Sequence, residues 1–143
     1  MSMLTRSENF TKNGKYLIST NDFHRFPVYY SESYYKRLKK DSNDSLCIGA
    51  FYKNKYIIGM FIGQYKYNSL LLRNLTNKSY FSCDHVCGLY IATIGVIDEV
   101  RRLGIGSQLI NHAIKYTKEN DRADVVYLHV IEYNQAAIMF YKK

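Results

Sequence analysis

Two apolar runs of similar length stand close together in the first half of the chain. Residues 46–52 and 56–62 are joined by the polar stretch 53–55, which is typical of a β-hairpin. Upstream, residues 16–19 predict a short strand, and residues 31–40 predict a helix with its aromatic and leucine side chains on one face. The first half therefore predicts a strand, a helix and a hairpin.

The second half alternates strand and helix patterns. Residues 89–97 form a nearly continuous apolar run, which is typical of a central strand buried on both faces. From Ile105 onward apolar residues recur at helical spacing, then residues 124–131 predict another buried strand and residues 134–141 another helix. The stretch 65–88 lacks periodicity and is expected to be a long connection, with an extension of the hairpin as the alternative. This order predicts an α/β fold with a mixed, partly parallel sheet.

Composition bounds the class of protein. With 143 residues, 47% hydrophobic and 22% charged, the chain is expected to form one domain over residues 1–143. No apolar run reaches the roughly 18 residues of a membrane span, and the first residues lack a secretory pattern, so we expect a cytoplasmic protein. The net charge of +8 favours an anionic partner without naming one.

A glycine-containing turn separates the run 89–97 from the helical pattern that follows. Glycines let a backbone approach a ligand closely, and the N–H groups of a first helical turn bind pyrophosphate. The turn matches neither a P-loop nor a dinucleotide-binding fingerprint. An ordinary tight turn stays open as an interpretation, but the flanking strand and helix and two arginines favour phosphate binding. The residues concerned are Arg101, Arg102, Leu103, Gly104, Ile105, Gly106 and Ser107.

The same turn carries a family resemblance. Arg101-x-x-Gly104-x-Gly106 resembles the acyl-CoA signature of the GCN5-related N-acetyltransferase (GNAT) superfamily. Four further stretches are similar to the protein N-terminal acetyltransferases of the NatE and NatF types, namely residues 26–30, 90–96, 127–130 and 134–141. The resemblance implies a GNAT fold, acetyl-CoA as cosubstrate and no metal. It also implies acetylation of the α-amino group of proteins that retain their initiator Met.

The resemblance implies roles for particular residues. Tyr90 and His129 hold the water that takes the proton of the amine, and Tyr141 lies near the departing sulfur. The amine is easier to deprotonate than a lysine, since its pKa lies near 7.7–8.0 rather than about 10.4. Without the family, a satisfied, partly buried histidine is the favoured interpretation of His129, and Tyr141 is equally an aromatic at the edge of the core. Acetyl-CoA is expected to contact the backbone of Ile94, Gly95 and Val96, the arginine–glycine turn, Asn134 and Tyr141.

The expected peptide pocket lies near the start of the chain, where a hydrophobic loop docked on the core is the plainer interpretation. The resemblance places Phe26, Pro27, Val28 and Tyr30 in this pocket, with Tyr90 and His129 beside them. Protein N-termini are the expected partners, with a ribosome or a Nat complex subunit beside them, and neither a specific nucleic acid nor a membrane is indicated. Cys83, His85 and Cys87 lack the second ligand pair of a structural zinc site.

Two other functions stay open. One is a GNAT transferase acting on a lysine or a small amine, against which residues 26–30 and the Tyr90/His129 pair argue. The other is a catalytically inactive, basic ribosome- or RNA-binding module, for which no RNA-binding signature is present. In the related fold two more strands follow the helix that ends near Tyr141. We therefore expect a C-terminally truncated domain that binds acetyl-CoA better than it acetylates peptides.

Overall fold

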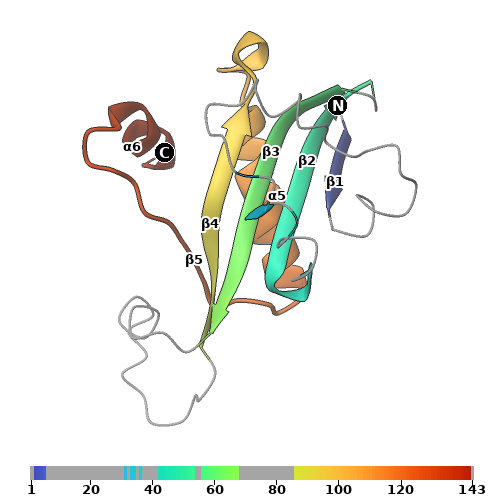
Figure 1. Cartoon of the computed structure of the whole chain (residues 1–143), viewed down its shortest axis with the longest axis vertical. Helices are drawn as coiled ribbons and strands as arrows, with labels where there is room; N and C mark the ends of the chain where they lie inside the picture. Colours follow the sequence, from blue (N-terminus) through green and yellow to red (C-terminus); the bar gives the residue numbers. More distant parts are fainter. Residues whose placement is uncertain are drawn as a thin grey trace.

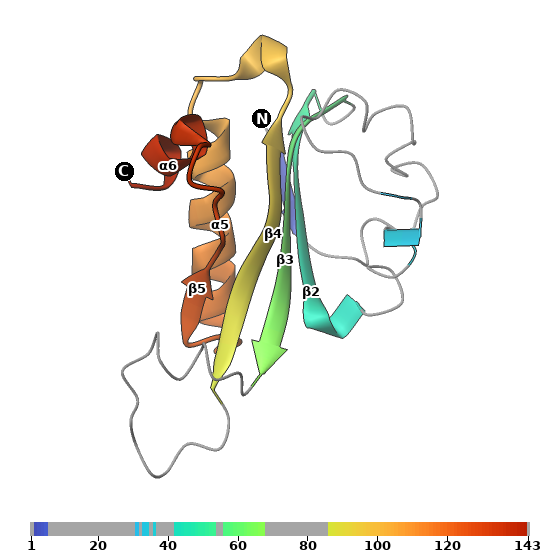
Figure 2. The ribbon, with the colours of Figure 1, turned by 60° about the vertical axis from the view of Figure 1, so that its left-hand side comes forward.

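The described part of the chain is built around one five-stranded sheet. The computed structural model describes residues 2–5, 31, 33–34, 36, 42–53, 56–67 and 86–142. The strands follow the order β1-β2-β3-β4-β5, and helix α5 covers one face of the sheet (Figures 1 and 2). The strands are β1 (Ser2–Thr5), β2 (Ser45–Tyr52), β3 (Tyr56–Tyr67), β4 (Cys87–Val96) and β5 (Val125–Tyr127), and the helices are η1 (Ser42–Asp44), η2 (Asp98–Val100), α5 (Ile105–Glu119) and α6 (Gln135–Tyr141).

The predicted hairpin is confirmed, and its second strand is longer than expected. Strands β2 and β3 pair antiparallel from Ser45↔Gln64 to Tyr52↔Tyr56. Strand β3 continues to Tyr67, which pairs with Cys87 of β4. The connection predicted over 65–88 is therefore wrong at both ends, where the alternative of an extended hairpin strand holds for residues 65–67 and β4 begins at Cys87. The extension has a physical basis, because Tyr65 is only 4% exposed and belongs to the core.

Strand β4 is an interior strand of the sheet and lies between β3, to which it is antiparallel, and β5, to which it is parallel. The central strand is confirmed, but burial on both faces is wrong, because buried and half-buried side chains alternate along it. Leu89 is fully buried, whereas Tyr90 is half-buried. The ladder with β5 stops at Tyr90, so the rest of β4 is not covered by that strand. The register with β3 shifts between Ile62 and Gly63, which marks a β-bulge close to the end of the β4–β5 ladder at Tyr90.

Helix α5 forms where the apolar periodicity predicted it. Its buried side chains are Ile105, Leu109, Ala113 and Thr117, one face of a helix. The helix contacts β2, β3 and β4. Gly59 permits this close packing, since a Cβ atom there would lie 3.1 Å from Ile105 Cγ2 and 3.2 Å from Leu109 Cδ1.

Strands β4 and β5 run together only briefly. They pair in parallel over three positions, from Gly88↔Val125 to Tyr90↔Tyr127. After Tyr127 the chain leaves β4 and reaches α6, which stands apart from the sheet (Figures 1 and 2). The strand predicted over 124–131 is thus real but shorter, since no ladder continues beyond Tyr127. The final helix agrees with its prediction.

Two predicted elements fall largely outside the described residues. The strand expected at 16–19 lies wholly outside them. Of the helix expected at 31–40, Ser33, Tyr34 and Lys36 have helical backbone. Among the helices in the described ranges, none has the length and apolar character needed to cross a membrane.

Candidate active site

Three aromatic rings gather where β4 and β5 part. The ring centroids of Tyr90 and His129 are 5.6 Å apart, those of Tyr90 and Tyr127 are 5.3 Å apart, and those of Tyr127 and His129 are 6.3 Å apart. Tyr90 and Tyr127 form the last pair of the parallel ladder, and His129 follows two residues later. The structure therefore brings together Tyr90 and His129, as the sequence predicted, and adds Tyr127.

Sequence reasoning missed Tyr127 as a functional candidate, although a signal was present. Residues two apart in an extended segment share one face, so Tyr127 was bound to share the face of His129. The abundance of tyrosine, 15 in all, hid this signal. Each tyrosine alone is an unremarkable strand residue.

The three rings differ in what they can do with a proton. Burial raises the pKa of the Tyr127 phenol, and the neighbouring Tyr90 raises it further. Tyr127 therefore stays protonated at neutral pH. His129 is exposed, and histidine is the side chain that most often serves as a general base, so it is the member of the cluster suited to accept a proton.

Beyond the cluster, the rest of β4 offers a strand edge. Over residues 91–96 its strand neighbour within the described part of the chain is β3 alone. Ile94, Gly95 and Val96, predicted to contact acetyl-CoA, lie in this stretch. A ligand carrying amide groups can add to such an edge as another strand would.

The turn after β4 has the geometry of a ligand-binding loop. Gly104 has φ +80°, a left-handed conformation that favours glycine, and Arg102 has φ +63°. Helix α5 begins at Ile105, directly after this turn. Leu103 is 68% exposed, and Ser107 is exposed as well. The N-terminus of a 15-residue helix thus meets an open turn, where backbone N–H groups favour an anion.

The two arginines of this turn differ from each other. Arg101 donates from Nε to the Val96 carbonyl at 3.0 Å and pairs with Asp98, so its charge is held within the turn. Arg102 is exposed and makes no ion pair with any residue that the structure describes. Arg101 therefore fixes the end of β4, whereas Arg102 is the charge open to a ligand.

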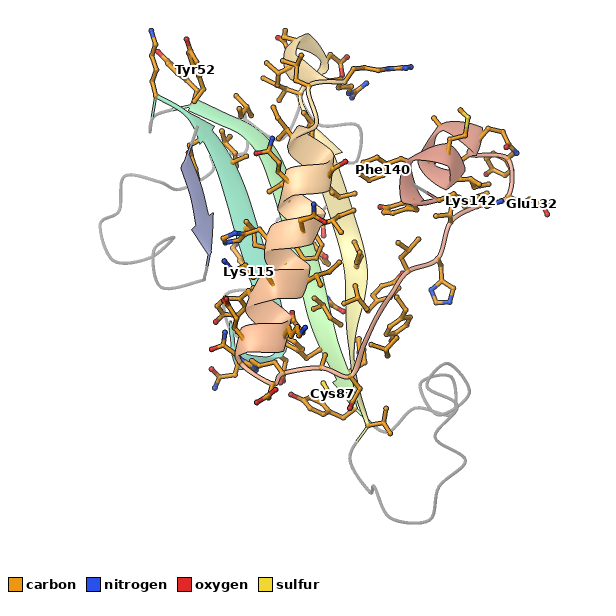
Figure 3. All side chains as sticks on the ribbon, turned by 180° about the vertical axis from the view of Figure 1, so that it is seen from behind. Tyr52, Cys87, Lys115, Glu132, Phe140 and Lys142 are labelled. Carbon is orange, nitrogen blue, oxygen red and sulfur yellow. The ribbon has the colours of Figure 1, made fainter. Side chains whose placement is uncertain are left out.

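Helix α6 lies against the beginning of α5. A Cβ atom on Gly106 would lie 3.1 Å from Phe140 Cζ, and Figure 3 shows Phe140 pointing from α6 toward α5. The Asn134 side chain accepts a hydrogen bond from the Ala137 N–H at 3.1 Å, which confirms the capping interpretation. Burial raises the pKa of the Tyr141 phenol. Tyr141 contacts Phe140 and is not part of the three-ring cluster.

The remaining predicted residues lie outside the described ranges. These are Phe26, Pro27, Val28 and Tyr30 of the peptide pocket, together with Cys83 and His85. Within the described ranges, no group of three or more His, Cys, Asp or Glu residues could hold a metal ion. The absence of a metal stays a prediction.

Curated proteins similar to this chain are N-acetyltransferases by name. The N-alpha-acetyltransferase 50 of Danio rerio is 31% identical over 118 residues, which cover 82% of this chain and 60% of that protein. The probable N-acetyltransferase san of Drosophila melanogaster is 42% identical over 55 residues, which cover 38% of this chain and 30% of that protein. The chain thus spans less than two-thirds of the length of these curated relatives.

Solved structures share the fold. Arabidopsis thaliana NAA60 in complex with acetyl-CoA is similar with a TM-score of 0.74 and 24% identity, over 99% of this chain and 84% of that one. Arabidopsis thaliana Naa50 in complex with a bisubstrate analogue has a TM-score of 0.61 and 23% identity, over 99% of this chain and 81% of that one. The family model described as "Acetyltransferase (GNAT) family" matches residues 16–143. The chain therefore belongs to the GNAT family of acetyltransferases.

Proposed function

We propose that this chain transfers an acetyl group from acetyl-CoA to the N-terminal α-amino group of proteins, especially those that retain their initiator Met. The observation that carries the proposal is the 5.6 Å approach of the Tyr90 and His129 rings at the end of the β4–β5 ladder. The names of the curated relatives support it, as do the acetyl-CoA and bisubstrate complexes of structural neighbours.

Acetyl-CoA binding is assigned to the edge of β4 and the turn that follows it. The backbone of Ile94, Gly95 and Val96 would pair with the amides of the pantetheine arm. The N–H groups at the start of α5 would bind the pyrophosphate. Arg102 would add a positive charge there, since Arg101 is bound to Val96 and Asp98. Asn134 would reach the same arm while it caps α6. Leu103, Ile105 and Ser107 belong to the same turn.

Proton removal is assigned to Tyr90 and His129. The amine must lose a proton before its nitrogen can attack the thioester carbonyl. His129 accepts this proton through a water molecule, and the Tyr90 hydroxyl orients that water. An α-amine, whose pKa is about 7.7–8.0, is easier to deprotonate than a lysine amine, whose pKa is about 10.4. The nitrogen then bonds to the acetyl carbon, the carbon–sulfur bond breaks, and the electron pair leaves on sulfur.

Stabilisation of the leaving thiolate is assigned to Tyr141. Burial raises the pKa of this phenol, so it stays protonated at neutral pH and donates a hydrogen bond to the thiolate. The peptide pocket is assigned to Phe26, Pro27, Val28 and Tyr30 on the resemblance alone. The cytoplasmic location and the ribosomal or complex-bound partner stay predictions.

The test compares two peptides of one composition. One begins with Met and has a free α-amine with its lysine blocked, and the other has a blocked α-amine and one free lysine. Thiol release from acetyl-CoA and the mass of the product are measured with purified chain. The proposal expects product with the first peptide only. Product with the second peptide alone would assign a lysine acetyltransferase, and no product with either would favour a module without catalysis.

A further inference from the structure

Tyr127 completes the three-ring cluster without a role in the mechanism given above. Its ring lies 5.3 Å from that of Tyr90, tilted by 49°, and 6.3 Å from that of His129 at an interplanar angle of 79°. The second arrangement is edge-to-face, a favourable geometry for aromatic rings. Tyr127 therefore contacts both groups to which proton removal is assigned.

His129 depends on these rings for its orientation. Strand β5 ends at Tyr127, so no ladder to β4 fixes the backbone at His129. The side chain is exposed, and no carboxylate in the described part of the chain forms an ion pair with it. Its ring contacts with described residues are those with Tyr90 and Tyr127. An imidazole on such a segment needs a neighbour to restrict its rotation.

We propose that Tyr127 is a positioning residue, whose ring holds the imidazole of His129 toward Tyr90 in the orientation that removes the proton of the amine. The inference rests on the proposed function and extends it to a residue that does not touch the substrate. The contacts of Tyr127 with Tyr90 and His129 are made by its ring. A phenylalanine at this position keeps that ring and is therefore expected to keep the positioning role.

The test uses kinetics of variants at position 127. Tyr127→Leu removes the ring, Tyr127→Phe removes only the hydroxyl, and Tyr52→Leu makes the same change at an exposed position of the β2–β3 hairpin (Figure 3). We expect Tyr127→Leu to lower kcat about three- to tenfold, the range of an aromatic pair converted to a rate. The KM for acetyl-CoA stays at its wild-type value, Tyr127→Phe restores the rate, and Tyr52→Leu leaves it unchanged.

A second background separates positioning from a general packing effect. If Tyr127 acts through His129, Tyr127→Leu lowers kcat in the wild-type protein and has no further effect in His129→Ala, since coupled residues are not additive. An equal loss in both backgrounds would overturn the inference, and so would wild-type kcat in Tyr127→Leu. Where Tyr127→Leu does not fold, Tyr127→Met serves in its place. A wild-type chain without turnover on α-amine peptides would instead overturn the proposed function.

Discussion

The two regions that carry the candidate site residues differ in how far their side chains are buried. The sheet–α5 region (β2, β3, β4 and α5) contains the fully buried side chains of Phe61, Leu89 and Leu109. In the β5–α6 region (residues 125–142), all three strand residues are half-buried and α6 has no buried residue. Tyr133 is 80% exposed and Met139 is 64% exposed. The sheet–α5 region thus contains the core, whereas no residue of the β5–α6 region is buried.

The residues assigned to the proposed reaction are divided between these two regions. The strand edge, the turn and Tyr90 belong to the sheet–α5 region, which folding fixes through apolar burial. His129 and Tyr141 belong to the β5–α6 region, which meets the first region through the parallel β4–β5 ladder, the three-ring cluster and the contact of Phe140 with Gly106. We therefore expect changes to the buried side chains of the first region to alter stability most, and changes to the exposed side chains of the second region to alter it little.

The largest expected effect contrasts one side chain from each region. Leu109→Ala removes a fully buried side chain of α5 and should lower the free energy of unfolding by about 2–5 kcal/mol. Met139→Ala on α6 is the matched control, because its side chain is 64% exposed, and should cost about 0.5 kcal/mol or less. Urea unfolding measures both. Equal losses would remove the proposed difference between the regions.

Alkaline pH should weaken the sheet–α5 region through the thiol of Cys47, a half-buried residue of β2. Burial raises the pKa of the Cys47 thiol in β2 from 9.0 to about 11. Between these values the unfolded chain has lost the proton that the folded chain keeps, so the free energy of unfolding falls as pH rises. The loss approaches about 2–3 kcal/mol by pH 11. The wild-type protein should show this loss in the free energy of unfolding, and Cys47→Ala should lack it. Identical pH dependence in the two proteins would contradict the prediction.

The smallest expected effect separates the two arginines of the turn. Arg102→Ala removes an exposed charge and should raise the Kd for CoA about two- to fivefold at low salt, an effect that added salt screens. Arg101→Ala removes the hydrogen bond to the Val96 carbonyl, so its effect on Kd should persist in high salt. Titration calorimetry at two salt concentrations measures both. The same salt dependence for both variants would place both charges at the ligand.

The sequence predicted best the elements whose burial is local and periodic. Helix α5 and strand β4 follow directly from their apolar patterns, and Asn134 from its position before a helix. The early end of β5 at Tyr127 could not be predicted, because the apolar run continues while the ladder partner diverges. The attachment of Arg101 to Val96 and Asp98 is a local side-chain contact within the turn that the glycine motif does not reveal. Among the site residues, Tyr90 and His129 came from a family resemblance, and Tyr127 was missed although the strand predicted over 124–131 places it on the same face as His129.

The most direct test of the account is the separation of turnover from CoA binding in His129→Ala and Tyr90→Phe. Proton removal by a positioned side chain contributes about 100-fold or more to rate, whereas CoA binding is assigned to the edge of β4 and the turn. Turnover on a Met-starting peptide and the Kd for CoA are measured for both variants. The account predicts turnover reduced about 100-fold with wild-type Kd. Wild-type turnover in both variants would contradict it.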